Sequence, residues 1–308
     1  MVALRFEANI SILFTELPLL ERPAAARAAG FDAVELWWPF SAPVPAPAEL
    51  DRLGDALGEA GVALVGLNFD GGDLAAGERG LLSLVDPDSG ARFTDNVACA
   101  LAFAESQGTR VLNALYGNRV EGVDPRAQDE VARERLAYAA DAAAGIGVRV
   151  VLETQNHLDS PLYPLVDPAD AAALVETMRS GGHDNVGLLC DYYHLAMEGF
   201  DLLGSTDRYL HLIDHVQLAD APGRHEPGTG AVDYPAVLGH LAGTGYAGWI
   251  GCEYRPSGAS AASFGWIERL AGLVPAAGEG GESGSRQPVA GSGPDAGRAG
   301  LDGQEDGR

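Results

Sequence analysis

The amino-acid sequence predicts an α/β protein in which eight parallel strands close into a single (β/α)8 TIM barrel. Short apolar, β-branched segments alternate with longer stretches of helical period that are rich in Ala, Leu, Arg and Glu. Eight such strand–helix units follow one another, and eight repeats in about 270 residues favour a closed barrel over an open doubly wound sheet. Gly30, Gly61 and Gly147 each separate a helical stretch from the next strand, as glycines at helix C-termini do.

Each expected strand is an apolar run that ends in polar residues, and the N-terminal segment MVALRFEANISILF leads directly into the first. In chain order, we expect strands at Leu4–Asn9, Ala33–Trp37, Val62–Asn68, Arg110–Leu115, Val148–Glu153, Val186–Asp191, Leu212–Leu218 and Trp249–Tyr254. The stretches after them predict helices near residues 17–29, 47–60, 91–107, 125–145, 167–180, 203–210, 234–244 and 259–271. A helix after every strand is the pattern of parallel strands joined by helical crossovers.

The barrel is expected to fill residues 1–274 as one domain, followed by a tail over residues 275–308. The tail is rich in Gly, Ser, Asp and Glu and has almost no large apolar residues. Because it buries too little apolar surface to offset the entropy of ordering, we expect it to be disordered. The N-terminus has no basic region followed by a cleavage site, and no apolar run approaches about 18 residues. We therefore expect a cytoplasmic protein without a membrane span.

Charge and composition exclude several function classes. The net charge of -24 repels nucleic acid and anionic membranes, so the expected partner is a small molecule. All 20 basic residues are arginine, which excludes Schiff-base aldolases, lysine-bound pyridoxal phosphate and P-loop nucleotide binding. Cys99, Cys190 and Cys252 are widely spaced in apolar runs and are expected to be buried, reduced thiols. Association into a homo-oligomer stays open, since the sequence displays no interface.

The ends of the last four strands carry the candidate metal ligands. Active residues of a TIM barrel stand at the C-terminal ends of its strands. The segments VVLETQNHLDS, VGLLCDYYH, HVQLAD and WIGCEYRP end in this way with Glu153, Asp191, Gln217 and Glu253. Three converging carboxylates repel one another unless a cation lies between them, and carboxylate and amide oxygens suit Mg²⁺, Mn²⁺ or Co²⁺. The alternative is that each acid pairs separately with an arginine or caps a loop.

Other polar residues near the strand ends are candidates for binding a substrate. Arg224, in the loop DAPGRHEPGTG, has the bidentate geometry that suits a carboxylate, or it is a solvated loop residue. His194 stands three residues after Asp191, where it polarises a substrate carbonyl or is a plain loop histidine. His157 and Asp159 follow Glu153 and have weaker claims.

The second and third strands add residues to the pocket. Glu35 and Asn68 end these strands and are expected to line the pocket. Trp37 and Trp38 are expected to pack rather than to stack on a substrate. His215 faces the same way as Gln217 one layer deeper, where a hydrogen-bonded core residue is more expected than a ligand.

Seven segments together resemble the hydroxypyruvate isomerases of the xylose-isomerase-like barrel superfamily. These segments are RFEANISILFTE, FDGGDLAAGERG, ETQNH, CDYYH, HVQLAD, RHEPGTG and GCEYRP, and the similarity extends from about residue 4 to 270. Gln217 and the AAGERG segment distinguish this group from the sugar epimerases, which typically carry His at the ligand position. The resemblance implies the same four metal ligands, with Glu153 and Glu253 as the acid/base pair and His194 and Arg224 in contact with the substrate.

The activity implied is an intramolecular oxidoreduction that interconverts hydroxypyruvate and tartronate semialdehyde through a cis-enediolate, assisted by one divalent metal ion. Related activities remain as alternatives on the same site: 2-oxotetronate isomerisation, sugar epimerisation, inosose dehydration, or binding of a sugar acid without turnover. The endonucleases of the related DNA-repair barrels need several zinc ions, more histidine ligands and a basic face, which seven histidines and a charge of -24 do not provide.

Overall fold

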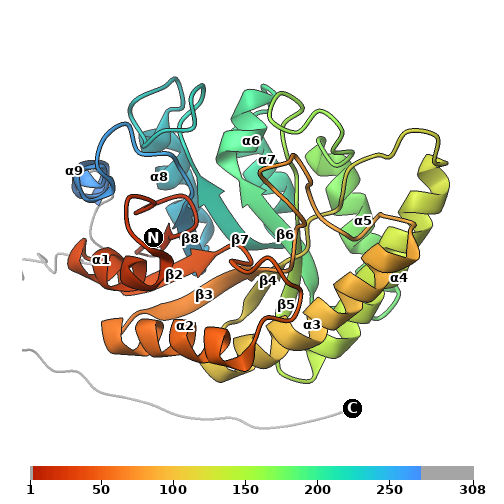
Figure 1. Ribbon diagram of the computed structural model, residues 1–308. Coiled ribbons are helices and arrows are strands. Elements are labelled where there is room, and N and C mark those ends of the chain that lie inside the picture. Colours follow the sequence, from red (N-terminus) through yellow and green to blue (C-terminus); the bar gives the residue numbers. More distant parts are fainter. Residues whose placement is uncertain (1–2, 272–308) are drawn as a thin grey trace, which may run out of the picture. The chain divides into compact units, whose positions relative to one another are not determined.

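The computed structural model of the chain describes residues 3–271, so the predicted tail lies outside the described residues. Eight parallel strands close into one barrel in chain order, β1 to β8, with helices around it (Figure 1). This confirms the predicted fold class. The strands are β1 (Arg5–Asn9), β2 (Ala33–Leu36), β3 (Ala63–Asn68), β4 (Val111–Asn113), β5 (Arg149–Glu153), β6 (Val186–Asp191), β7 (Ile213–Leu218) and β8 (Trp249–Cys252).

The helices match the predicted crossovers, with differences at their ends. They are η1 (Leu19–Glu21), α1 (Arg22–Ala28), α2 (Pro47–Ala60), α3 (Pro87–Gln107), α4 (Pro125–Ala144), α5 (Pro168–Ser180), α6 (Tyr192–Met197), α7 (Leu202–Tyr209), α8 (Tyr234–Thr244), η2 (Ser260–Ala262) and α9 (Gly265–Ala271). The predicted first and last helices are each divided into a 3-10 turn and an α-helix. The sequence did not predict α6, because six residues are too few to display a helical period.

Several strands are shorter than predicted, because the chain leaves the barrel early to build its mouth. β4 ends at Asn113 instead of Leu115, and Tyr116 then pairs with Gly80 of the loop after β3. β2 ends at Leu36 instead of Trp37, and β8 ends at Cys252, so that Glu253 lies one residue beyond it.

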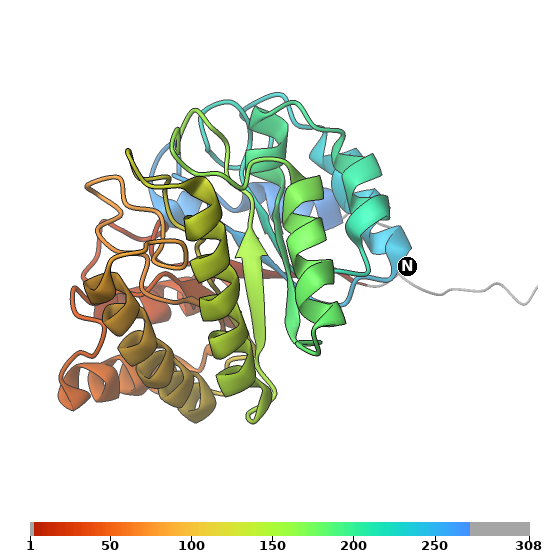
Figure 2. The same ribbon diagram turned by 90° about the vertical axis from the view of Figure 1, so that its right-hand side faces the viewer.

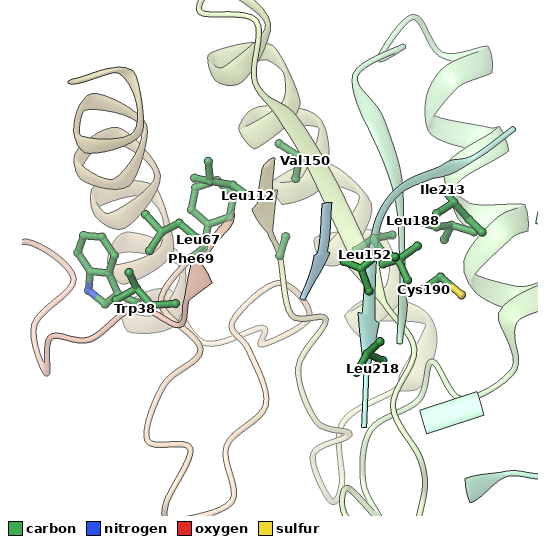
Figure 3. Close-up of a cluster of buried hydrophobic side chains, with 14 of the residues drawn as sticks. Trp38, Leu67, Phe69, Leu112, Val150, Leu152, Leu188, Cys190, Ile213 and Leu218 are labelled. Carbon is green, nitrogen blue, oxygen red and sulfur yellow. The ribbon is translucent and has the colours of Figure 1, made fainter. Parts of the chain in front are cut away.

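Alternation along the strands sorts apolar side chains to the outside of the barrel and polar ones to the inside. Figure 3 shows part of the buried apolar layer, with Leu112, Val150, Leu152 and Leu188 on the neighbouring strands β4, β5 and β6. Asn113 and Glu153, which directly follow Leu112 and Leu152, belong instead to a set of buried polar side chains at the barrel centre. The barrel interior is thus built for chemistry at its C-terminal end.

The long loops gather at that same end. Figure 2 shows β5 as a yellow-green arrow that points toward the loops, with helices packed along the outside of the barrel. No helix among residues 3–271 is both long and apolar enough to cross a membrane. All three cysteines are free thiols; Cys190 and Cys252 are buried, as predicted, whereas Cys99, which was also expected to be buried, is half-buried.

Candidate active site

The four predicted ligands meet at the C-terminal ends of β5 to β8. Asp191 lies directly beside Gln217 in the β6–β7 register, and Gln217 lies beside Gly251 in the β7–β8 register. Glu153 is the last residue of β5, and Glu253 follows the last residue of β8. All four side chains are buried. The structure therefore brings together the residues that the strand ends predicted.

A cavity of about 690 Å³ borders this cluster. Glu153 and Glu253 line it, whereas Asp191 and Gln217 are buried without lining it. Its other polar lining residues include Trp37, Asn68, Arg79, Gln155, Asp159, Ser160, Tyr193, His194, Arg224 and Arg255. The cavity is thus lined by both acidic and basic groups, which is typical of a site for a small polar molecule.

Both glutamates are held in place by donors from other strands. Glu253 Oε1 accepts hydrogen bonds from Trp37 Nε1 at 2.6 Å and from Asn9 Nδ2 at 3.0 Å. Glu153 Oε2 accepts one from Asn113 Nδ2 at 2.8 Å. These contacts fix the carboxylates at opposite sides of the cluster, because β5 and β8 are separated by β6 and β7.

Two buried oxygens of the cluster have no hydrogen-bond donor among the described residues. They are Asp191 Oδ2 and Gln217 Oε1. A buried acceptor without a partner costs free energy, so such atoms are rare unless an ion or ligand satisfies them. Three carboxylates and one amide oxygen form a set of hard donors, which fits a divalent cation such as Mg²⁺, Mn²⁺ or Co²⁺.

The electrostatics of the cluster favour an added positive charge. Burial raises the pKa of Asp191 to about 6 and that of Glu253 to about 7, although Arg224 lowers both. Burial, followed by the charges of Glu253 and Asp191, raises the pKa of Glu153 well above its ordinary range. Each shift means that ionising these carboxyl groups is unfavourable without a compensating cation.

His194 is a buried, neutral imidazole that faces the cluster. Its Nδ1 accepts the backbone N–H of Asn156 at 3.0 Å, so the ring proton resides on Nε2. Nε2 lies 3.5 Å from Glu153 Oε1 and 3.6 Å from Asp191 Oδ2. Burial, with the charges of Arg224 and Arg79, lowers the pKa of His194 well below its usual value. His194 is therefore placed to donate a hydrogen bond.

Arg224 is a largely buried part of the cluster and not a solvated loop residue. Its Nη2 lies 2.6 Å from Glu253 Oε2 and 3.7 Å from Asp191 Oδ2, and its guanidinium stacks on Tyr193. The residue has a φ of 56°, in the left-handed region that a non-glycine residue rarely adopts. Its backbone N–H bonds to Asp220 O, and its carbonyl accepts from Arg255 N, which holds this conformation in place.

A second layer of polar residues lies one alternation deeper in the barrel. Glu35 Oε1 accepts from Gln217 Nε2 at 2.7 Å, which leaves Gln217 Oε1 as the atom free to act as a ligand. His215 Nε2 lies 2.8 Å from Glu35 Oε2 and 3.2 Å from Glu7 Oε1, as expected for a hydrogen-bonded core histidine. A Cβ at Gly251 would collide with the Glu35 carboxylate, so this glycine makes room for it.

The remaining predicted pocket residues have mixed outcomes. Asn68 and Asp159 line the cavity, and Asp159 Oδ2 accepts from Tyr193 OH at 2.8 Å. His157 is exposed and bonds to Glu198 outside the cavity. Glu35 was expected in the pocket but lies beneath it, because it is one alternation short of the strand end.

Sequence reasoning missed several residues of the site. Asn9 and Asn113 bond the two glutamates, and Trp37, which was expected to pack, donates to Glu253 and lines the cavity. Arg79 and Tyr193 also line the cavity. Asn9 was visible as the polar last residue of its predicted strand, the rule already applied to the last four strands, whereas Asn113 was not, because the predicted fourth strand continued to Leu115.

Comparison with known proteins identifies relatives over most of the chain. The family described as xylose isomerase-like TIM barrel matches residues 23–270. A Streptomyces coelicolor protein, provisionally named a hydroxypyruvate isomerase, is 52% identical over 266 residues, which cover 85% of this chain and 95% of that protein. A 2-oxo-tetronate isomerase of Cupriavidus necator is 37% identical, and the match covers 87% of this chain and 99% of that enzyme.

A solved structure supports the same relationship. The structure titled AP endonuclease, family 2, from Brucella melitensis has a TM-score of 0.78 and is 35% identical, with 87% of this chain and 99% of that chain covered. Among the described residues of this chain, His194 is the only histidine that lines the cavity, so the cavity wall does not offer the several histidine ligands expected of a DNA-repair endonuclease. The chain belongs to the xylose isomerase-like TIM barrel family and, like its relatives from Streptomyces and Cupriavidus, is an isomerase.

Proposed function

We propose that the chain interconverts hydroxypyruvate and tartronate semialdehyde. One observation carries this proposal. Two buried oxygens, Asp191 Oδ2 and Gln217 Oε1, have no hydrogen-bond donor among the described residues, and they lie between two buried glutamates. This arrangement suits a cation together with proton transfer between neighbouring carbon atoms. The names of the two relatives support a small hydroxy-oxo acid as the substrate.

One divalent ion, Mg²⁺, Mn²⁺ or Co²⁺, is held in this proposal by Glu153, Asp191, Gln217 and Glu253. When bound, it supplies Lewis acidity to the carbonyl and hydroxyl oxygens of the substrate. Gln217 adds a neutral donor. The charge of Arg224 and the two charges of the ion then balance the three carboxylates, which agrees with the raised pKa values of the cluster.

Glu153 and Glu253 act as the proton-transfer pair. One carboxylate removes a proton from C3, and the electron pair left behind forms the cis-enediolate. The same or the facing glutamate returns a proton at C2, while the hydroxyl proton passes from O3 to O2, so that the product is an isomer of the substrate. Burial raises the pKa of both groups and a bound cation opposes this rise, so that each carboxyl group is ionised and can accept a proton.

The other polar residues hold the substrate. His194 donates from Nε2 to a substrate oxygen, and its neutral state lets it do so without repelling a cation. Arg224 contacts the substrate next to Glu253, and Asn68 and Asp159 bind from the cavity wall. We place the reaction in the cytoplasm, where three free thiols remain reduced.

The direct test replaces each proton-transferring glutamate. Glu153→Gln and Glu253→Gln should each lower kcat by roughly 100-fold or more, since each variant retains an amide oxygen but cannot take up a proton. Formation of tartronate semialdehyde is followed by proton NMR, and bound metal is measured in the same samples. Glu134→Gln, at an exposed position on α4, is the control. Full activity of Glu253→Gln with metal bound would show that the assignment is wrong.

A four-carbon substrate is the second candidate. The cavity of about 690 Å³ exceeds the size of a three-carbon acid, and the Cupriavidus relative is named for a 2-oxo-tetronate. Comparing kcat/KM for hydroxypyruvate, 2-oxotetronates and free ketoses ranks the two acids and tests sugar epimerisation. A product that has lost water would instead indicate a dehydratase, and thermal stabilisation by the acids without turnover would indicate a binding protein.

A further inference from the structure

Arg79 is a cationic group of the cavity whose role the proposed function leaves open. The cavity has three arginines, Arg79, Arg224 and Arg255. Arg224 pairs with Glu253, whereas neither of the other two forms an ion pair with any residue among positions 3–271. Arg255 is exposed and Arg79 is half-buried. A half-buried cation without an acidic partner is unfavourable unless an anion binds it.

The guanidinium of Arg79 is held from two sides. Its Nε donates to Ser160 Oγ at 3.0 Å, and its Nη1 donates to Glu78 O at 2.7 Å and to Leu74 O at 3.0 Å. Ser160 Oγ in turn donates to Gln155 Oε1 at 2.6 Å, which orients the hydroxyl to accept. No described residue accepts a hydrogen bond from Nη2. Arg79 is thus a positioned cation whose Nη2 can still donate hydrogen bonds to a ligand.

The backbone that carries Arg79 is fixed to the end of β4. Gly117 N donates to Arg79 O at 2.9 Å, and Gly80 forms a bridge with Tyr116. Gly80 has a φ of 111°, and a Cβ there would overlap the carbonyl of Leu115, so only glycine allows the loop to approach this closely. The AAGERG segment therefore places Arg79 at a defined point of the cavity wall.

The neighbouring charges favour an anion next to Arg79. Burial, followed by the charge of Arg224, lowers the pKa of Arg79, and the charges of both arginines contribute to lowering that of His194. Because Glu253 and Asp191 already face Arg224, its charge is largely balanced within the cluster. The charges of Asp159 and Glu153 act on Arg79 without forming an ion pair with it, so Arg79 is the positioned cation that can still pair with a ligand.

We propose that Arg79 binds the carboxylate of the substrate and makes the site specific for hydroxy-oxo acids over neutral ketoses. This inference rests on the proposed function and adds a specificity-determining residue to it. The substrate carboxylate accepts from the unused Nη2, while the reacting carbons lie toward Glu153 and Glu253. The same contact offsets the repulsion that a chain of net charge -24 exerts on an anionic substrate.

The test compares Arg79→Met with Arg255→Gln, which also removes a positive charge from the cavity but from an exposed, unpositioned side chain. In the first variant, the KM for hydroxypyruvate should rise roughly 10- to 100-fold, as for a lost charge-assisted hydrogen bond, with kcat changed less than about threefold. The kcat/KM for dihydroxyacetone, a neutral analogue, should stay within about threefold. Arg255→Gln should change the KM for hydroxypyruvate by less than about threefold.

A binding experiment separates this proposal from the proposed function. D-Glycerate carries the carboxylate but cannot isomerise in the same way, and glycerol is its neutral counterpart. D-Glycerate should raise the Tm of the metal-loaded wild-type protein and of Arg255→Gln, but not that of Arg79→Met, and glycerol should distinguish none of them. Absence of hydroxypyruvate turnover with this pattern intact would refute only the proposed function. Equal stabilisation of Arg79→Met and wild type, or equal losses on both substrates, would overturn the role of Arg79.

Discussion

At the scale of single residues, the orientation of one amide determines what the site can bind. The amide of Gln217 has a donor, Nε2, and an acceptor, Oε1. Nε2 donates a hydrogen bond to Glu35 Oε1 at 2.7 Å. The oxygen of Gln217 is left for a cation. A ligand whose orientation is set by an outer partner typically loses about 10- to 100-fold in metal affinity when that partner is changed.

Glu35→Gln should therefore weaken metal binding without removing a ligand. The new amide can present its own NH2 group to Gln217, which leaves the orientation of both amides undefined. We expect the Kd of the metal-free protein for Mn²⁺ to rise about 10-fold, as measured by titration calorimetry. Glu7→Gln, in the same layer but without contact to Gln217, should bind Mn²⁺ as the wild type does. An unchanged Kd for Glu35→Gln would contradict this role of Glu35.

Glu7 should give the fold a measurable pH dependence. Burial, followed by the charge of Glu35, raises its pKa from 4.5 to about 8. The unfolded chain loses this proton near pH 4.5 and the folded chain near pH 8, so the contribution to stability is complete below pH 4.5 and is lost as the pH rises to 8. Between pH 5 and 8, the free energy of unfolding of the metal-loaded wild type should fall by roughly 2–4 kcal/mol more than that of Glu7→Gln. If urea denaturation gives the same change in the free energy of unfolding with pH for the wild type and Glu7→Gln, this role of Glu7 is wrong.

The residue scale also shows where sequence reasoning stops. The convergence of the four proposed ligands was predictable, because a polar residue after a buried strand run marks the C-terminal end of a barrel strand. Trp37 was not, since only the three-dimensional position of its indole N–H, 2.6 Å from Glu253 Oε1, distinguishes a hydrogen-bond donor from a packing residue. Arg79 was inside a recognised motif, but its role depends on which loop carbonyls accept its donors.

At the scale of elements, the loop after β7 is organised by one carboxylate. Asp220 accepts four backbone N–H groups, from Ala221 at 2.9 Å, Gly228 at 2.7 Å, Thr229 at 3.0 Å and Val232 at 3.1 Å. This loop carries Arg224 in its left-handed conformation. The side chain of Asp220 thus supports a residue of the active site through the loop backbone.

Asp220→Asn should destabilise this loop and lower activity. The new NH2 group faces backbone donors, so about half of the four hydrogen bonds are lost, at a cost of roughly 2 kcal/mol in the free energy of unfolding. The kcat/KM for hydroxypyruvate should fall with it, because Arg224 is no longer held beside Glu253. Asp233→Asn, at the N-cap of α8, is the matched control and should cost less than about 1 kcal/mol and leave kcat/KM unchanged. Equal effects of the two variants would contradict a special role for Asp220.

The element boundaries illustrate the same limit of prediction. The order of strands and helices followed from periodicity, but the early end of β4 depends on the bridge between Gly80 and Tyr116, two residues far apart in sequence. The short helix α6 begins at Tyr192, and its N-cap is the proposed ligand Asp191, whose Oδ1 accepts from Tyr193 N at 2.8 Å. A prediction from the local sequence pattern detects neither of these two contacts.

At the scale of the whole molecule, the barrel collects isolated strand ends into one charged cluster. The buried carboxyl groups of Asp191 and Glu253 have raised pKa values of about 6 and about 7. Their contribution to the stability of the metal-free protein is complete below the unfolded values and is lost as the pH rises through these folded values. A bound cation removes this penalty, so metal should stabilise the protein more at high pH.

The increase in Tm on adding Mn²⁺ to chelated protein should therefore be larger at pH 8 than at pH 5.5. In the Asp191→Asn variant, the increase in Tm on adding Mn²⁺ should be smaller and should depend less on pH. Differential scanning calorimetry at the two pH values measures this directly. An increase in Tm that is the same at both pH values would mean that the cation binds away from the buried carboxylates.

The central claim is that the four donors at the ends of β5 to β8 hold one divalent ion on which the isomerisation of hydroxypyruvate depends. The most direct test is the initial rate of tartronate semialdehyde formation by chelated protein during titration with Mn²⁺. The account predicts a rate near zero without metal that rises and saturates at one ion per chain, and no such rise in Gln217→Leu at the same metal concentrations. A rate that is independent of metal, or an equal rise in Gln217→Leu, would contradict it.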